Sequence, residues 1–199
     1  MRGSVTKQRA VSAQAPQRVR IIGGNWKRTP LPVAHVSGLR PTPDRVRETL
    51  FNWIEHLLPD LGAVRGLDMF AGTGALGFEL ASRGAKHVTL IETNRQLIDQ
   101  LMQIKRKLAA DQIEIIAADV LAIAARWPAA SFELIFVDPP FDSGLIGPAL
   151  TAAPRLLASD GLIYAELGAE IDDSLAGHAL QVVRQGRAGR VHFYLLRHA

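Results

Sequence analysis

The chain reads Leu67-Asp68-Met69-Phe70-Ala71-Gly72-Thr73-Gly74-Ala75-Leu76-Gly77 in its first half. The three glycines fit the spacing G-x-G-x-x-G, between an apolar strand predicted at 63–70 and an apolar helix predicted at 75–83. Glycines in such a turn let the backbone approach a ligand and let the helix pack closely on the strand. The spacing alone also fits an ordinary strand-to-helix turn, so its surroundings must decide between the two interpretations.

Strands and helices alternate along the chain after this turn, which predicts a parallel, doubly wound α/β sheet. The C-terminal part differs, because two strands predicted at 179–184 and 190–197 are joined by the short loop 185–189 and therefore form an antiparallel hairpin. The expected elements between the glycine turn and this hairpin are strands 86–91, 112–117, 132–138 and 161–166, and helices 94–109, 120–126 and 144–157.

The segment before the glycine turn predicts a small N-terminal β extension and one amphipathic helix. Residues 18–23 predict a strand, and residues 25–33 a turn and a second short strand. Residues 44–57 predict a helix with one apolar face. The fold class is therefore α/β, with a mostly parallel, seven-stranded, Rossmann-like sheet that ends in an antiparallel hairpin.

Four acidic residues follow four successive strands of the predicted sheet, and ligands bind at the carboxyl ends of such strands. Glu92 suits a carboxylate that accepts hydrogen bonds from ribose hydroxyls, and Asp119 suits an acceptor for an adenine amino group. Asp119 is equally well explained as the N-cap of the next helix. Asp68 lies inside its strand, where a carboxylate would oppose a pyrophosphate but suits a cationic amino acid. The acids therefore favour S-adenosylmethionine over NAD.

The fourth acid belongs to the tetrapeptide Asp138-Pro139-Pro140-Phe141, which follows a continuous apolar strand. Two consecutive prolines fix φ twice and remove two N–H donors, so the carbonyls there are acceptors only. Acceptors beside an aromatic face suit a planar base that carries an exocyclic amino group. The alternative is that Asp followed by Pro only ends the strand.

The glycine turn, Glu92, Asp119 and the tetrapeptide resemble class I methyltransferases that modify exocyclic amino groups of nucleic-acid bases. Two other segments are similar to RsmD-type enzymes, the 16S ribosomal RNA guanine-N2 methyltransferases. They are Gly38-Leu39-Arg40-Pro41-Thr42-Pro43-Asp44-Arg45-Val46-Arg47-Glu48-Thr49-Leu50-Phe51-Asn52-Trp53 and Arg20-Ile21-Ile22-Gly23-Gly24-Asn25-Trp26-Lys27-Arg28. The resemblance covers nearly the whole chain, and these two segments make it specific.

The resemblance implies a class I methyltransferase fold, S-adenosylmethionine as the cofactor, and methylation of the 2-amino group of a guanine in 16S ribosomal RNA. The RNA would belong to an assembling or assembled small ribosomal subunit, and the enzyme would be a monomer. Direct methyl transfer requires no metal, so we expect none. The expected catalytic residues are Asp138, Pro139, Pro140 and Phe141. The expected cofactor-binding residues are Thr42, Asp68, Phe70, Gly72, Gly74, Glu92, Asp119 and Val120.

Charge is unevenly distributed in this chain of 199 residues and net charge +4. Residues 1–43 contain eight Lys or Arg and no Asp or Glu, which suggests a polyanionic partner. We expect residues 1–17 to be a flexible basic tail, and 18–199 to be one methyltransferase domain in which 18–43 form an RNA-binding β extension. The expected RNA-binding residues are Arg20, Lys27, Arg28 and Arg40.

The sequence has no cysteine, which is compatible with a reducing cytosol and excludes thiolate catalysis and cysteine-bound metal. No apolar run approaches the length that spans a bilayer, and residues 1–17 lack the apolar region of a secretory signal. We therefore expect a cytoplasmic protein without a membrane partner.

Three other functions stay open. A methyltransferase that acts on an adenine or cytosine amino group in DNA would carry the same tetrapeptide. An NAD-binding oxidoreductase would carry the same glycine spacing. A non-catalytic RNA-binding module with an inactive cofactor fold is the third, and the intact Asp138, Phe141 and glycine turn argue against it.

Overall fold

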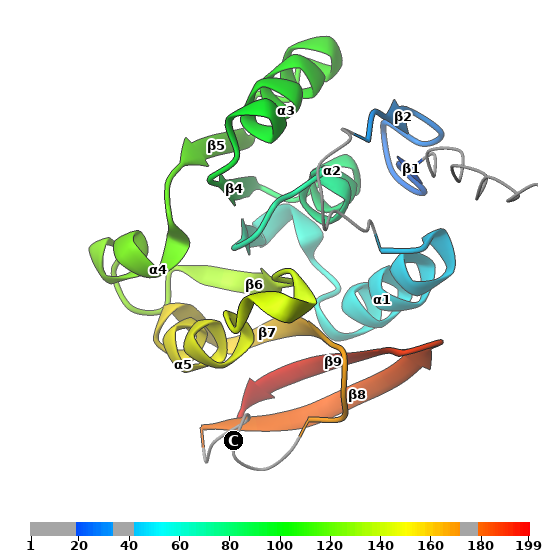
Figure 1. Cartoon of the computed structure of the whole chain (residues 1–199). Coiled ribbons are helices and arrows are strands. Elements are labelled where there is room, and N and C mark those ends of the chain that lie inside the picture. Colours follow the sequence, from blue (N-terminus) through cyan, green and yellow to red (C-terminus); the bar gives the residue numbers. More distant parts are fainter. Residues whose placement is uncertain (1–18, 34–41, 172–178) are drawn as a thin grey trace, which may run out of the picture.

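The computed structural model describes residues 19–33, 42–171 and 179–199. In this part of the chain one seven-stranded sheet has the strand order β5-β4-β3-β6-β7-β9-β8 (Figure 1). Strands β3 to β7 run parallel to their neighbours, whereas β9 is antiparallel to both β7 and β8. The strands are β3 (Arg65–Asp68), β4 (His87–Glu92), β5 (Ile113–Ala117), β6 (Phe132–Val137), β7 (Leu157–Leu167), β8 (Leu180–Ala188) and β9 (Val191–His198).

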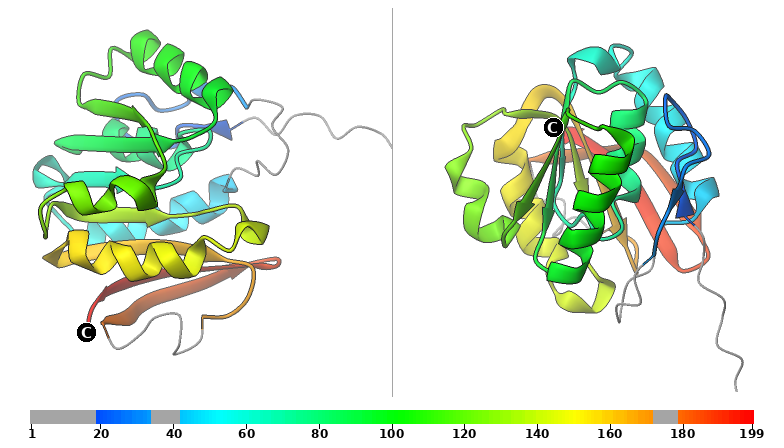
Figure 2. Two further views of the ribbon diagram at one scale, coloured as in Figure 1. Left: turned by 60° about the vertical axis from the view of Figure 1, so that its left-hand side comes forward. Right: turned by 90° about the horizontal axis from the view of Figure 1, so that it is seen from above.

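Helices cover both faces of the sheet, as the view from above shows (Figure 2). One face carries α1 (Asp44–Leu57), α2 (Ala75–Ser82) and α3 (Arg95–Leu108), and the other carries α4 (Val120–Ile123) and α5 (Ile146–Leu156). Three short 3-10 turns complete the described structure, namely η1 (Leu61–Ala63), η2 (Ala124–Arg126) and η3 (Phe141–Ser143). The fold class expected from the sequence is confirmed.

Strand β6 illustrates how two apolar layers form around one strand. Successive side chains of a strand point to opposite faces, so Phe136 joins the core under α1 to α3 while Ile135 joins the core under α4 and α5. The Phe136 ring lies 6.2 Å, centroid to centroid, from the rings of both Phe51 and Tyr164. A strand buried on both faces requires a continuous apolar run, which is what residues 132–137 supply.

The crossover between β3 and β6 divides the sheet at its centre. The chain leaves β3 toward β4 and β5 on one side, then returns to form β6 and β7 on the other. Ligands in open α/β sheets bind at such a switch point, outside the carboxyl ends of the strands. The glycine turn lies there, with left-handed φ values of 53° at Gly72 and 79° at Gly74.

Helix α1 matches its predicted range of 44–57, but several other boundaries were wrong. Strand β7 begins at Leu157, directly after α5, rather than at 161. The predicted helix at 120–126 ends at Ile123 and continues as a 3-10 turn.

The C-terminal hairpin is longer than predicted, because residues 185–188 lie in β8 and leave only Gly189 and Arg190 as the turn. Gly186 is not a loop residue. A Cβ there would lie 2.3 Å from the Phe193 ring, so glycine makes room for that ring. The register of β8 also shifts between Val182 and Arg184, which forms a bulge in this outermost strand.

The N-terminal extension has shorter strands than predicted, β1 (Val19–Arg20) and β2 (Pro30–Leu31), which pair antiparallel. The turn between them docks on the end of α2. The backbone N–H of Asn25 donates to the Ser82 carbonyl at 2.7 Å, and the Ser82 hydroxyl donates to the Gly23 carbonyl at 2.6 Å. Gly24 has φ +72°, and a Cβ there would lie 1.8 Å from the Ser82 carbonyl oxygen, so only glycine permits this approach.

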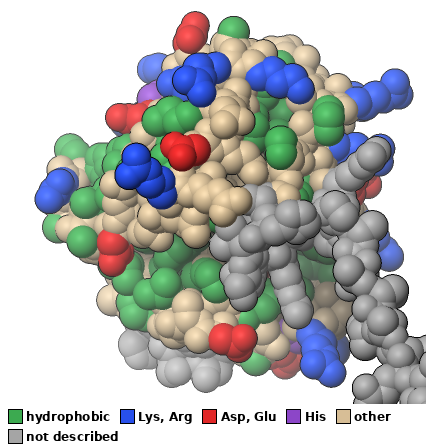
Figure 3. Space-filling view, turned by 45° about the horizontal axis from the view of Figure 1, so that its top comes forward, with side chains coloured by type: hydrophobic (Ala, Val, Ile, Leu, Met, Phe, Trp, Pro, Cys, Tyr) green, Lys and Arg blue, Asp and Glu red, His purple; other side chains and the backbone are tan. Residues whose placement is uncertain are grey.

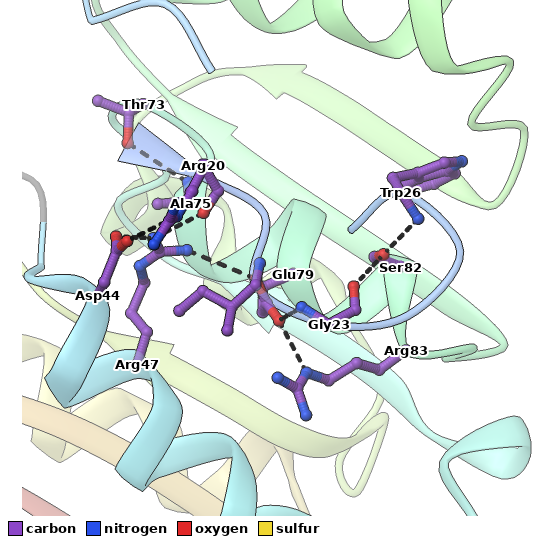
Figure 4. Close-up of polar contacts among 11 residues, drawn as sticks. Arg20, Gly23, Trp26, Asp44, Arg47, Thr73, Ala75, Glu79, Ser82 and Arg83 are labelled. Carbon is purple, nitrogen blue, oxygen red and sulfur yellow. Dashed lines mark hydrogen bonds and ion pairs between the residues drawn. The ribbon is translucent and has the colours of Figure 1, made fainter. Parts of the chain in front are cut away.

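A buried carboxylate, Glu79 of α2, joins the extension to the helices (Figure 4). It accepts hydrogen bonds from the backbone N–H of Ile22 at 2.6 Å and of Gly23 at 2.8 Å. It also accepts from Arg83 Nε at 2.8 Å and lies 3.5 Å from Arg47 Nη1. This role of Glu79 was not predicted, although a single acid in an otherwise apolar helix indicates a buried polar contact.

Arg47 extends the same network into α1. Its side chain is fully buried, and its Nη2 donates to the Arg20 carbonyl and to Asp44 Oδ1, both at 2.7 Å. The Nε of Arg47 has no hydrogen-bond partner among the described residues. The guanidinium therefore depends on Glu79 and Asp44 to offset the cost of burying its charge.

Within the described ranges, no helix is long and apolar enough to cross a membrane. The same residues contain no cluster of three or more His, Asp or Glu side chains that could hold a metal ion.

Replacing Glu79 by alanine should lower the free energy of unfolding by about 3–5 kcal/mol, because the buried Arg47 would keep only one of its two acidic partners and the N–H groups of Ile22 and Gly23 would lose their acceptor. Urea denaturation followed by circular dichroism measures this loss. The matched control is Glu55→Ala, because Glu55 is the half-exposed partner of Arg83 at 2.7 Å. That change should cost no more than about 1 kcal/mol. Equal losses in the two variants would contradict a central role for Glu79.

Candidate active site

Five acidic side chains lie at or just beyond the carboxyl ends of five neighbouring strands. In sheet order they are Asp119 after β5, Glu92 in β4, Asp68 in β3, Asp138 after β6 and Glu166 in β7. The structure brings the four predicted acids to one edge of the sheet, on both sides of the switch point. It adds Glu166, which the sequence analysis missed.

Asp68 is 2% exposed and accepts hydrogen bonds from the backbone N–H groups of Phe70 and Gly77. Burial, and to a smaller extent the nearby Glu92 charge, raise the pKa of Asp68 to about 7, against the lowering effect of the two backbone donors. No cation of the described residues pairs with Asp68. A cationic ligand group would therefore be favoured beside it.

Gly77 explains why the third glycine of the turn is needed. A Cβ at this position would lie 2.1 Å from Leu90 Cδ2 and 3.4 Å from Asp68 Oδ2. Glycine therefore allows α2 to pack directly on β4 while its backbone N–H reaches the Asp68 carboxyl.

Glu92 holds the glycine turn against the end of β4. Its Oε2 accepts a hydrogen bond from the Gly72 backbone N–H at 2.9 Å. Its Oε1 accepts from the backbone N–H groups of Thr93 and Asn94, both at 2.8 Å. The side chain is half-buried, so it has a structural role in the turn as well as a position from which it can meet a ligand.

Asp119 is the N-cap of α4, the alternative that the sequence left open. Its Oδ1 accepts a hydrogen bond from the Leu121 backbone N–H at 2.9 Å. The side chain is exposed, so capping does not occupy the whole carboxylate. Val120 is buried in the core under α4, and Phe70 is half-buried directly after β3.

The tetrapeptide begins directly after β6. Burial raises the pKa of Asp138 well above its ordinary value, and the charges of Glu166 and Asp68 add to this effect. Pro139 is buried and Pro140 is exposed, so the chain reaches the surface at the second proline. Phe141 opens the η3 turn with 44% of the residue exposed, an unusual amount for a large aromatic side chain.

One residue before α1 and two residues of β7 form the surroundings of Asp138. Thr42, just before α1, has its Oγ1 2.7 Å from Glu166 Oε1 and 3.5 Å from Asp138 Oδ2. The Tyr164 hydroxyl donates to the same Glu166 Oε1 at 2.6 Å. Val137 is in register with Ala165, so Asp138 and Glu166 continue that register as neighbours. An acid at the end of one more apolar strand was the signal that could have revealed Glu166.

This edge of the sheet can accept hydrogen bonds from amino and hydroxyl groups and can stabilise cations. It is a poor site for a pyrophosphate, because the buried Asp68 and Glu166 and the half-buried Asp138 lie around the switch point. The geometry therefore favours a cationic nucleoside over a dinucleotide.

Similarity to known proteins identifies the family of this chain. The family model described as Conserved hypothetical protein 95 matches residues 19–197. Ribosomal RNA small subunit methyltransferase D of Escherichia coli (strain K12) is 40% identical over 160 residues, which cover 79% of this chain and 78% of that protein. This chain belongs to the RsmD family.

Other members of the RsmD family show the same agreement. The protein of the same name from Haemophilus influenzae is 41% identical over 159 residues, or 76% of this chain and 80% of that protein. The solved structure of yhhF from Escherichia coli superposes with a TM-score of 0.78 at 37% identity, and covers 91% of this chain and 98% of that one.

The predicted RNA-binding residues of this RsmD-family chain are only partly described. Lys27 and Arg28 are exposed in the turn between β1 and β2, and neither forms an ion pair with a described residue. Arg20 is exposed but its Nε lies 3.0 Å from Asp44 Oδ2, so part of its charge is already paired. Arg40 and the tail of residues 1–17 lie outside the described residues.

Asp68→Asn should remove a pH dependence of stability. The pKa of Asp68 is raised from 3.8 to about 7 by folding, so the folded state holds a proton that the unfolded chain releases. Protonated Asp68 therefore makes its whole contribution to the free energy of unfolding below about pH 4. This contribution declines as pH rises and is lost above about pH 7. Relative to the variant, the wild type should lose roughly 3–5 kcal/mol across this range.

Urea unfolding at a series of pH values measures this difference. Asp99→Asn, at an exposed position of α3, is the control and should change stability equally at every pH. A constant difference between wild type and Asp68→Asn from pH 4 to pH 7 would show that Asp68 titrates normally.

Proposed function

We propose that this protein transfers a methyl group from S-adenosylmethionine to the 2-amino group of a guanine in 16S ribosomal RNA. The observation that carries the proposal is the position of Asp138 and the exposed Phe141 at the switch point, beside the buried Asp68. Family membership supports the same activity, because the relatives that match are named as ribosomal RNA small subunit methyltransferases. The nature of the base is inferred from the resemblance of residues 38–53 and 20–28 to RsmD-type enzymes.

The residues at the switch point fit S-adenosylmethionine, which supplies an electrophilic methyl group on a sulfonium when it is bound. Asp68 is buried without a cationic partner among the described residues and would pair with the ammonium of the amino-acid part. Glu92 would accept hydrogen bonds from ribose hydroxyls, and the exposed Asp119 would accept one from the adenine amino group. The other residues expected to line this site are Thr42, Phe70, Gly72, Gly74 and Val120.

Asp138 and the Pro139 carbonyl would position the nucleophile. The lone pair of a guanine 2-amino group is delocalised into the ring, which makes it a weak nucleophile. Hydrogen bonds from both amino hydrogens to these acceptors favour a pyramidal nitrogen with its lone pair directed at the methyl group. Phe141 would stack on the base, which must be unpaired or flipped out of a helix to reach it.

RNA binding would begin at the N-terminal extension, where Lys27 and Arg28 offer two exposed charges in one turn. The substrate would be 16S ribosomal RNA within an assembling or assembled small subunit. On the face that the space-filling view shows, Lys and Arg side chains lie at several separate places (Figure 3). Phosphate contacts of this kind position the RNA and leave base selection to the pocket.

The alternatives are less well supported. A DNA amino-methyltransferase would need the same tetrapeptide, but the matching relatives are named for ribosomal RNA. An NAD-dependent oxidoreductase would place a pyrophosphate near Asp68, where the carboxyl groups oppose it. A non-catalytic module would not need an acid and an exposed aromatic ring together at the end of β6.

Asp138→Ala should reduce methylation of 16S ribosomal RNA by at least about a hundredfold, because its acceptors meet only the reacting amine. Single-turnover transfer of labelled methyl groups to small subunits from cells lacking the activity measures this loss. S-adenosylmethionine should raise the melting temperature of wild type and variant alike, and NADH should raise neither. Asp142→Ala, at the next exposed acid of the same turn, is the matched control and should keep wild-type turnover.

Full activity in Asp138→Ala would show that the tetrapeptide only ends the strand. Stabilisation of the wild type by NADH and not by S-adenosylmethionine would overturn the cofactor assignment itself.

The double variant Lys27→Gln/Arg28→Gln should bind RNA less tightly, with a salt slope lower by roughly two units at most, about one per lost phosphate contact. Titrations at several salt concentrations measure the slope, and the melting-temperature shift with S-adenosylmethionine should not change. The comparison variant neutralises Arg187 and Arg190 of the C-terminal hairpin, which are also exposed. A lower slope in that variant alone would place the RNA along the hairpin.

A further inference from the structure

We propose that Glu166 is a positioning residue for methyl transfer: it holds the Thr42 hydroxyl beside Asp138, and its fixed negative charge makes Asp138 the site that receives the proton released by the amino group. This inference rests on the proposed methyltransferase function. It assigns a role to a residue that lies outside the tetrapeptide, on the neighbouring strand β7.

Two hydroxyl groups contact the same carboxylate oxygen of Glu166. The Tyr164 hydroxyl, two residues earlier on the same strand face, donates to Oε1 at 2.6 Å, and Thr42 Oγ1 lies 2.7 Å from the same oxygen. These short contacts fix the carboxylate without a cation, because no Lys, Arg or His of the described residues pairs with Glu166. Burial raises the pKa of Glu166, and the two hydroxyl donors act against burial by stabilising its ionised form.

The hydroxyl hydrogen of Thr42 can stabilise the charge of only one of the two carboxyl groups, Glu166 or Asp138. A threonine hydroxyl has one hydrogen, and the shorter distance commits it to Glu166 rather than to Asp138 Oδ2 at 3.5 Å. Thr42 therefore lowers the pKa of Asp138 only through a long contact, and this does not offset burial and the Glu166 charge, which raise that pKa. The two carboxyl groups divide their roles: Glu166 carries the negative charge, and Asp138 binds the proton.

The surrounding groups support this division. Glu166 faces Tyr164 on β7, Asp138 after β6 and Thr42 before α1, and its register partner on β9 is the uncharged Phe193. Burial and the Glu166 charge both raise the pKa of Asp138, and the Asp68 charge on β3 adds to them.

The chemical step balances within this arrangement. The amino nitrogen forms a bond to the methyl carbon, and the carbon–sulfur bond breaks with its electron pair remaining on sulfur. The methylated amino nitrogen is then positively charged and must lose a proton. An N–H bond breaks, its electron pair returns to nitrogen, and the proton binds the Asp138 carboxylate. Asp138 must therefore be ionised before transfer, so the rate should rise with pH through the Asp138 pKa.

The test is the pH profile of single-turnover methylation at saturating S-adenosylmethionine and RNA. Glu166→Gln keeps the size of the side chain and removes its charge, so the midpoint of the acidic limb should move about one pH unit lower. Thr42→Ser keeps the hydroxyl and should retain the wild-type midpoint, whereas Thr42→Val should not. Glu114→Gln, at an exposed glutamate of β5, is the matched control and should leave the profile unchanged.

Tyr164→Phe provides a second measurement if Glu166→Gln does not fold. It removes one donor to Glu166 and keeps the ring, so the midpoint should move in the same direction by less. An equal loss of rate at every pH, with an unmoved midpoint in both variants, would overturn the proposal and leave Glu166 a structural residue. A wild-type protein that binds S-adenosylmethionine but methylates no RNA would instead refute the proposed function.

Discussion

The buried Glu79 carboxylate is the interaction on which the arrangement of the site depends. It connects the backbone of the N-terminal extension with Arg47 of α1 and with its own helix α2. Helix α1 begins just after Thr42, so the residue that touches Asp138 and Glu166 precedes the helical turn that Arg47 anchors to Glu79. The charge of Glu79 is costly to bury, and the hydrogen bonds and ion pairs from several elements offset that cost.

The acidic residues at the sheet edge also come from several elements. The strand order brings five acids from five strands together, although they are spread from residue 68 to residue 166 along the chain. Burial and neighbouring negative charges raise the pKa values of Asp68 and Asp138 among them. A site of this kind is stabilised by a ligand that brings positive charge and hydrogen-bond donors.

Much of this architecture could be predicted because it follows from periodicity and from turn residues. The alternation of apolar strands and helices predicted the sheet, and α1 was predicted to the residue. The four acids at strand ends could be recognised because each directly follows an apolar run. Glu166 was missed although it ends an apolar run, because no glycine turn or proline pair follows it to mark a site.

What could not be predicted depends on contacts between distant segments. Gly186 was assigned to a loop because nothing local shows that the Phe193 ring needs its space. Glu92 was expected to meet only a ligand, yet it also holds the Gly72 backbone. These features come from pairs of residues brought together by the fold.

The bulged strand β8 also has a consequence for the outer border of the sheet. It is the last strand in the described order, and its exposed positions carry Gln181, Arg184, Gln185 and Arg187. A bulge interrupts its hydrogen-bonding pattern between Val182 and Arg184, and charged side chains follow it. Strands of other chains can pair with an exposed edge strand, and bulges and charged side chains hinder that pairing. The C-terminal hairpin therefore ends the sheet in a form that resists aggregation.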